Sequence, residues 1–267
     1  MDITAQLESG RILPLVFRLT VPAVIAQLIT FLYNIVDRMY VSRIQGSGMD
    51  ALAALGIVLP ITECAIQIVF NINLNRATGG NKDYTAALTV MLSALQLISL
   101  PLNGFGNGMQ PFVSYNYGKG NAQRLKKGIT YVTVIAFIFA LVVWSASLAV
   151  PEMYAYLFSA SDSVTHIVKS YCPMFLMGSI MFFVQMTLQN VNVALGQAKS
   201  ALILAVIRKV IILIPLCFVL THFLGFKGVY MSEGIADLVA GIITTVVIFT
   251  TFPRIFKKRQ QEVQQIV

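Results

Sequence analysis

The chain has 267 residues, of which 57% are hydrophobic and only 11% are charged, and its formal net charge is +8. Soluble domains carry about 25% charged residues, so this composition excludes an ordinary water-soluble protein and indicates an integral membrane protein. The basic residues lie in short clusters that flank long apolar runs. That distribution is typical of loops at a membrane surface and argues against nucleic acid as a partner.

Seven apolar segments follow one another along the chain, each near the ~20 residues that a bilayer-spanning helix needs. Backbone groups in lipid must be hydrogen-bonded within the segment, so all seven are predicted to be helical. The predicted fold class is an all-α integral membrane protein with about seven transmembrane helices. Their approximate bounds are Leu13–Val41, Ala51–Leu74, Tyr84–Pro111, Ile129–Val150, Val164–Ala194, Ala201–Leu224 and Gly228–Phe252.

The charges between these segments predict the orientation of most of the chain. The loops Gly118–Gly128 and Gly196–Ser200 and the tail after Pro253 are basic, and each is two spans from the next. Basic loops stay in the cytoplasm, so the C-terminus is predicted to be cytoplasmic and the acidic loop Pro151–Ser163 to lie outside. We expect a multi-pass protein of the cell membrane, with a cytoplasmic basic tail over 254–267.

The first two segments leave the side of the N-terminus open. Seven full spans put it outside, whereas an N-terminus inside requires that Ala51–Leu74 does not cross the membrane. Arginines flank the first span on both sides, for example Arg18 and Arg38, so charge does not decide. Exposing backbone to lipid costs more than overriding a weak charge bias. Seven spans with an external N-terminus are therefore the favoured expectation, and a re-entrant Ala51–Leu74 is the alternative.

Glu63 lies at the centre of the second apolar segment, which holds no other charge. A carboxylate at that depth costs roughly 3 kcal/mol on insertion scales, so its presence points to cation binding, proton transfer or a water-filled cavity. Gln67 and Asn71 follow it at helical spacing and extend the polar stripe. The first segment carries a similar stripe, which consists of Gln27, Thr30, Asn34 and Asp37.

Two later segments carry polar residues that have simpler explanations. Gln185, Gln189 and Asn192 recur at helical spacing, and hydrogen bonding between helices explains them as well as a cavity does. Glu233 and Asp237 lie near the start of the last segment, where a place at the helix end is the favoured expectation over ion binding. The sequence shows no nucleophile–base pair and no metal-ligand spacing. Neither an enzyme nor a cofactor is therefore expected.

Six stretches of the sequence carry a family resemblance. They are PAVIAQLITFLYNIVDRMYVSRI (Pro22–Ile44), TECAIQIVFN (Thr62–Asn71), QPFVSYNYGKGN (Gln110–Asn121), ALGQAKSA (Ala194–Ala201), IRKVIILIPL (Ile207–Leu216) and GVYMSEGIAD (Gly228–Asp237). They resemble parts of the multidrug and toxic compound extrusion (MATE) transporters, especially the MepA-like branch. The first three resemble the first helix, the seventh helix and the end of the eighth helix with its loop. The last three resemble the tenth-to-eleventh loop, the eleventh helix and the twelfth helix. Gly234 departs from that branch, in which proline is common.

The resemblance implies a mechanism. Members of this family have two six-helix lobes and expel cationic drugs in exchange for Na⁺ or H⁺, so the chain is expected to be an antiporter of organic cations in the lipid bilayer. The resemblance also implies that Asp37 and Glu63 are the coupling carboxylates of the two lobes. The aspartate that some relatives carry in the tenth helix has no counterpart in Tyr171–Asn192, which leaves Gln185 only as a candidate polar substitute. The expected ion-coupling and substrate cavity consists of Glu63, Asp37, Asn34, Gln67 and Gln185, with Na⁺ as a candidate ion at Glu63.

The length of the chain departs from the two-lobe pattern. The resemblance covers helix one, the start of helix two and helices seven to twelve, so residues 1–60 are predicted to be an N-lobe remnant and 61–253 a C-lobe-like bundle. Three functions are open at this point. They are an antiporter, acting alone or as a homodimer that rebuilds two lobes; an internally shortened relative that does not transport; and a flippase of lipid-linked precursors, which calls for a more basic cavity.

Overall fold

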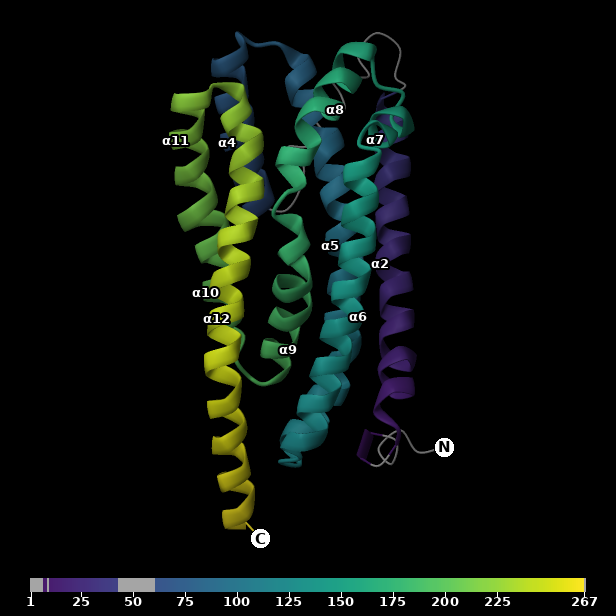
Figure 1. Ribbon diagram of the computed structural model, residues 1–267, viewed down its shortest axis with the longest axis vertical. Helices are drawn as coiled ribbons and strands as arrows, with labels where there is room; N and C mark the ends of the chain where they lie inside the picture. Colours follow the sequence, from purple (N-terminus) through teal and green to yellow (C-terminus); the bar gives the residue numbers. More distant parts are fainter. Residues whose placement is uncertain (1–6, 9, 43–60, 267) are drawn as a thin grey trace.

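The computed structural model of the protein describes residues 7–8, 10–42 and 61–266, apart from the side chains of 33–42, 61–64, 260 and 263–266. Within these residues every regular element is a helix, and the helices form one elongated bundle (Figure 1). The elements are α2 (Ile12–Ser42), α4 (Ile61–Thr78), α5 (Lys82–Gly118), α6 (Ala122–Ala149), α7 (Glu152–Leu157), α8 (Asp162–Leu176), η1 (Ser179–Met181), η2 (Phe183–Leu188), α9 (Gln189–Ala194), α10 (Ala198–Val206), η3 (Ile207–Leu213), α11 (Ile214–Leu224) and α12 (Phe226–Ile266).

Five of the described helical stretches are long and apolar enough to cross a membrane, and a bent pair makes a sixth. These six correspond to six of the seven predicted segments, and the all-helical membrane fold is confirmed. The remaining segment, Ala51–Leu74, lies partly outside the described residues. Its described part belongs to α4, which is not among the five candidate spans.

The bent span consists of α8 followed by η1, η2 and α9, with an angle of 49° between its halves. A break exposes backbone groups that the helix no longer pairs, and these need other partners inside a membrane. Here the carbonyl oxygen of Leu176 accepts hydrogen bonds from Nε1 of Trp144 and from Oγ of Ser179, each at 2.8 Å. The break is therefore a hydrogen-bonded feature of the bundle.

Both ends of the described chain lie at the same end of the bundle (Figure 1). Arg124, just after the turn between α5 and α6, donates to the carbonyl oxygens of Leu7 at 2.9 Å and Gly10 at 2.6 Å. Arg259, near the end of α12, donates to the carbonyl oxygen of Gly118 at 2.9 Å. The described start of the chain thus lies at the same end of the bundle as the end of α12, whereas the favoured expectation put the two termini on opposite sides of the membrane; the side on which each terminus lies stays a prediction. Side chain to backbone hydrogen bonds hold the start of α2 beside the basic α5–α6 turn.

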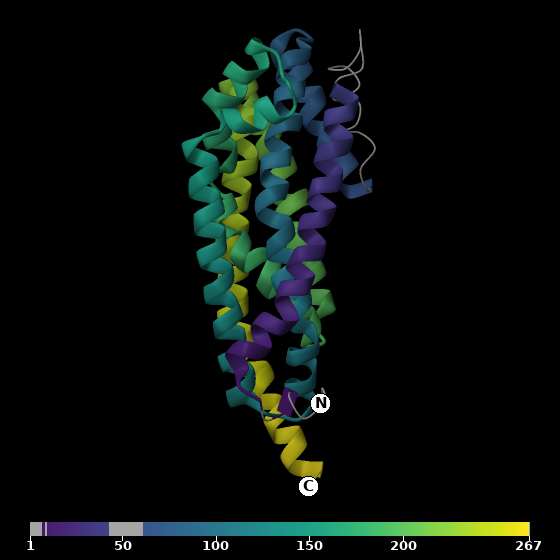
Figure 2. The same cartoon turned by 90° about the vertical axis from the view of Figure 1, so that its right-hand side faces the viewer.

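Helix α2 packs along α5 in antiparallel fashion, and both views place the two helices side by side (Figures 1 and 2). Two glycines of α5 permit this contact. A Cβ atom at Gly104 would lie 2.7 Å from Cα of Val24, and one at Gly108 would lie 2.6 Å from the carbonyl oxygen of Leu19. Small residues allow membrane helices to approach closely, so these glycines set the distance between α2 and α5.

Substituting Gly108→Ala should lower the stability of the bundle, because the added methyl group has no space between α5 and α2. Overpacking of this kind typically costs about 1–3 kcal/mol. The matched control is Gly118→Ala in the same helix, where no atom lies within 4 Å of the added Cβ. Thermal unfolding of the purified variants in detergent measures the difference. Equal midpoints for the two variants would contradict the described α2–α5 contact.

Candidate functional site

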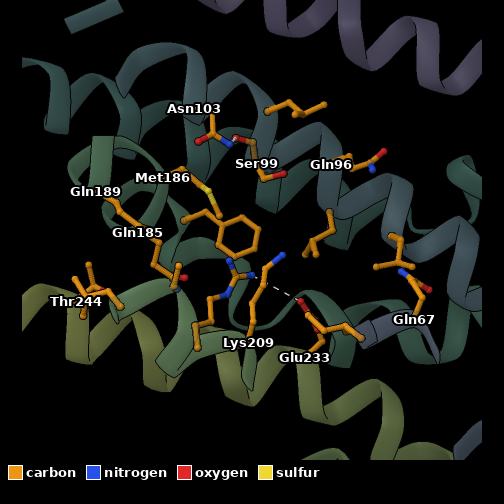
Figure 3. Close-up of a pocket in the computed structure, with 18 of the residues that line it drawn as sticks. Gln67, Gln96, Ser99, Asn103, Gln185, Met186, Gln189, Lys209, Glu233 and Thr244 are labelled. Atoms are coloured by element: carbon orange, nitrogen blue, oxygen red, sulfur yellow. Dashed lines mark hydrogen bonds and ion pairs between the residues drawn. The ribbon is translucent and has the colours of Figure 1, made fainter. Parts of the chain in front are cut away.

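A polar cavity of about 430 Å³ lies inside the bundle between α4, α5, the bent span, η3 and α12 (Figure 3). Its wall combines apolar side chains with amides and charges from helices that are distant in the sequence. The lining residues are Ile66, Gln67, Phe70, Leu92, Leu95, Gln96, Ser99, Leu100, Asn103, Phe182, Gln185, Met186, Gln189, Leu204, Ala205, Arg208, Lys209, Glu233 and Thr244. This size lies within the range of small-molecule sites.

Two of the predicted site residues, Gln67 and Gln185, meet at this cavity although they come from α4 and η2. The Gln185 Nε2 donates to the main-chain oxygen of Asp237 at 2.8 Å, which links the bent span to α12. Gln189 also lines the cavity, and its Nε2 donates to the carbonyl oxygen of Ala201 at 2.6 Å. Both explanations given for the stripe on the bent span therefore hold for Gln185 and Gln189, whose amides join helices and also line the cavity, whereas Asn192 does not line it.

Three predicted site residues cannot be placed as side chains. Glu63 belongs to the first turn of α4, and Asn34 and Asp37 belong to the C-terminal part of α2, but all three side chains lie outside the described residues. No described residue of α2 lines the cavity. The contribution expected from the first-segment stripe therefore finds no support in its described members, Gln27 and Thr30.

A buried ion-pair network forms one wall of the cavity. The Nε of Arg208 donates to Oδ1 of Asp237 at 2.8 Å, and its Nη2 lies 2.6 Å from the same oxygen. The same Nη2 lies 3.7 Å from Oε1 of Glu233, which makes a looser ion pair. The guanidinium group also lies over the ring of Phe182, 4.8 Å from the centroid. Asp237 thus holds Arg208 tightly, while Glu233 stays at the cavity wall.

The helix-end placement expected for Glu233 and Asp237 is wrong. Helix α12 begins at Phe226, so the two carboxylates lie two and three turns into it and face η3. Glu233 is 6% exposed and Asp237 is fully buried. The reason is that Arg208, inside the preceding span, supplies a counterion at the same depth.

Arg208 and Lys209 are residues of the candidate site that the sequence-based expectations did not include. Lys209 lines the cavity and interacts electrostatically with Glu233 and Asp237. A signal was present in the sequence: two adjacent basic residues interrupt an apolar segment, and an acidic pair spaced by four residues interrupts the next one. Buried charges in membrane helices are usually paired with each other, so this balance would have predicted the network.

Two π-helical segments hold the residues on either side of the ion-pair network. Gln185 lies in the π-helix η2 and Arg208 in the π-helix η3, and such wide turns are frequent at functional sites. Downstream of η3, Pro215 lacks the N–H group that a regular helix requires, which favours the wider turn before it.

Glycines bring the bent span directly against α12. A side chain at Gly178 would collide with the carbonyl oxygen of Gly234 and lie 2.7 Å from Cβ of Asp237. A Cβ atom at Gly234 would likewise collide with the carbonyl oxygen of Met174. The departure from the family pattern at Gly234 therefore coincides with a point where two backbones touch.

The fold and the site together define a multi-pass membrane protein with a charged internal cavity. The MatE family model matches residues 66–219, which is more than half of the chain. The chain belongs to this family.

Similar proteins include two named multidrug export proteins and a solved MATE structure. The multidrug export protein MepA of Staphylococcus haemolyticus (strain JCSC1435) is 31% identical over 184 residues, which cover 67% of this chain and 39% of that protein. MepA of Staphylococcus aureus (strain NCTC 8325 / PS 47) is 26% identical over 168 residues, which cover 61% of this chain and 36% of that protein. A crystal structure of MATE in the bent conformation has a TM-score of 0.68 at 19% identity and matches 79% of this chain and 46% of that chain. The matched part of the chain therefore spans less than half the length of each of these three proteins.

Substituting Asp237→Asn should destabilise the protein strongly, because it leaves the Arg208 guanidinium buried without its main counterion. Breaking a buried ion pair typically costs about 3–5 kcal/mol. The matched control is Lys169→Gln, which removes the solvent-exposed ion pair with Glu152 and should change stability little. Unfolding in detergent, followed by circular dichroism, measures both variants. A small, equal effect of the two substitutions would contradict the buried network.

Proposed function

We propose that this chain forms the ion-coupled part of a transporter that exports organic cations in exchange for Na⁺ or H⁺. Membership of the MatE family supports transport, and similarity to multidrug export proteins supports organic cations as the substrate class. The observation that carries the proposal is Glu233, a carboxylate at the wall of a polar cavity that is only loosely paired with Arg208. A cation that enters the cavity can therefore compete for this carboxylate.

The charge balance of the cavity supports exchange. The described charges at its wall are the cations Arg208 and Lys209 and the anion Glu233, and Asp237 lies directly behind Arg208. With both carboxylates ionised these four charges sum to zero. A bound organic cation adds one positive charge, and a proton on Glu233 adds another. Like charges repel strongly in a low-dielectric site, so the cavity favours one of the two ligands at a time.

Glu63 and Asp37 remain predicted coupling residues on the strength of the family resemblance. Glu63 precedes the cavity-lining Gln67 by one helical turn in α4. Glu233 is the additional candidate that the described cavity supplies. Several acidic side chains at different depths would allow an ion and a substrate to exchange in successive steps.

The proposed location is the cell membrane, with the basic ends of α5, α6 and α12 in the cytoplasm. The basic α5–α6 turn and the basic end of α12 lie together at one end of the bundle, as the positive-inside rule requires. The chain spans 39% of one multidrug export protein that it matches and 46% of a solved MATE chain. A homodimer that faces two such cavities toward each other is the proposed arrangement.

The flippase alternative gains no support from this cavity. Arg208 and Lys209 make it more basic than the sequence suggested, but Glu233 and Asp237 balance both charges among the described residues. A polyanionic lipid-linked precursor requires a net positive site. The remaining alternative is a relative that does not transport, and the ethidium accumulation experiment below distinguishes it from the proposal.

Cells that lack their own exporters should accumulate less ethidium when they express this chain. Glu233→Gln should bring accumulation back to the level of the empty vector, because the amide keeps the shape of the side chain but loses its charge. Glu152→Gln is the matched control, since Glu152 lies in the short helix α7 outside the cavity. Fluorescence of the accumulated dye is the measurement, with Glu63→Gln run alongside as the variant that the family resemblance predicts to be inactive.

Two results would count against parts of this proposal. Wild-type chain that leaves ethidium accumulation unchanged, despite correct insertion, supports the non-transporting alternative. Export that survives Glu233→Gln removes Glu233 from the mechanism. A protonophore and the replacement of external Na⁺ by K⁺ then identify the coupling ion, since only dissipation of the correct gradient should stop export.

A further inference from the structure

A second, apolar groove of about 710 Å³ lies on the other side of the bent span, between α6, η2 and α12. Its lining residues on α6 lie in the N-terminal half of that helix, and those on α12 begin at its middle and run toward its C-terminal end. The groove is lined by the aromatic side chains of Phe249, Phe252 and Phe256 on α12 and by Phe183 and Val184 of η2. Phe249 is 74% exposed, so the groove opens on the outer face of the bundle.

The polar groups that line this groove are almost all satisfied within their own helices. The hydroxyl groups of Thr130, Thr133 and Thr245 donate to carbonyl oxygens of the preceding turn at 3.0, 2.7 and 2.7 Å. Hydroxyls bonded in this way offer little to a ligand. The wall of the groove therefore suits a hydrocarbon chain and not a polar substrate.

Positive charge is concentrated at one end of the groove. Lys126 is exposed and is the one charged residue among the described residues that line it. Lys127 follows it, and Arg254, Lys257 and Lys258 are exposed on α12 beside the lining residues Pro253 and Phe256. The segments 121–128 and 253–259 contain no acidic residue. This end of the groove therefore attracts an anion.

The dimensions of the groove fit one leaflet of a bilayer. Its lining residues on α12 run from Thr245 to Phe256, which corresponds to about 16 Å along a helix. That length is roughly half of the ~30 Å hydrocarbon core, and the basic residues lie at the end where lipid headgroups are found. We propose that this groove is a binding site for an anionic phospholipid, with an acyl chain along η2 and α12 and the headgroup phosphate at Lys126.

The groove is a separate recess from the central cavity, and lipid binding there does not require that the chain transports. It shares the bent span and α12 with that cavity. On the bent span, Gln185 and Met186 face the cavity and Phe183 faces the groove; on α12, Thr244 faces the cavity and Thr245 faces the groove. A lipid in the groove would pack against the same π-helix that donates a hydrogen bond to Asp237. The bound lipid thereby supports the outer side of the functional site.

The test is native mass spectrometry of the full chain, released from nanodiscs that contain equal amounts of phosphatidylglycerol and phosphatidylcholine. Wild-type protein should retain phosphatidylglycerol in preference to phosphatidylcholine. Lys126→Gln should reduce that preference about fivefold. A basic residue near an anionic membrane surface contributes about 1 kcal/mol of binding free energy, which corresponds to about that factor in affinity. Lys127→Gln is the matched control, because Lys127 is exposed in the same turn but does not line the groove, and it should have a smaller effect.

A second pair of variants tests the acyl-chain position. Val134→Trp fills the groove and should abolish lipid retention, whereas Ile138→Trp, one turn further along α6 and exposed outside the groove, should not. Equal retention of the two lipids, or an unchanged preference in Lys126→Gln, would overturn the proposal. So would a dimer mass that disappears in Val134→Trp, because the groove would then be covered by a second copy. Lys126→Gln keeps the test valid if the tryptophan variant does not fold.

Discussion

The ion pair between Arg208 and Asp237 is the constraint on which the arrangement of the site depends. Both residues belong to spans with strongly apolar sequences, where an unpaired charge is expensive and a paired one is tolerated. Their contact fixes the position of η3 against α12. Because Asp237 takes the two short contacts of the guanidinium, Glu233 one turn earlier is left with a distant one. The Arg208–Asp237 pair therefore gives the two carboxylates different roles: Asp237 holds η3 against α12, and Glu233 faces the cavity.

The bent span lies between two recesses of different character, the charged cavity and the apolar groove. Gly178 allows the break to press against α12, and Trp144 and Ser179 satisfy the carbonyl oxygen that the break exposes. Beyond the break, the π-helix η2 presents the Gln185 amide to the charged cavity and aromatic and aliphatic side chains to the apolar groove. A regular helix of the same length would lack the wide turn that holds Gln185 against the main chain of Asp237. Polar and lipid-like ligands are thus separated by a single helical wall.

Much of the fold could be predicted from the sequence, because lipid imposes helices on long apolar segments and basic loops mark their ends. The meeting of Gln67 and Gln185 at one cavity followed from polar stripes at helical spacing. The position of the N-terminus could not be derived, since it depends on Arg124 binding carbonyl groups more than a hundred residues away. The role of Glu233 and Asp237 was also missed. The charges of one segment do not reveal this role, because they are stable only as a set contributed by two neighbouring spans.

A double-mutant cycle on Arg208 and Asp237 tests the central claim most directly. The free energy of unfolding is measured for Arg208→Met, Asp237→Leu and the double variant, with a parallel cycle on Arg208 and Glu233→Gln. The account predicts that the double variant is more stable than the sum of the two single effects implies, with a coupling of roughly 1–3 kcal/mol, and that the coupling to Glu233 is clearly smaller. Additive effects within about 0.5 kcal/mol for Arg208 and Asp237, or a stronger coupling to Glu233, would contradict it.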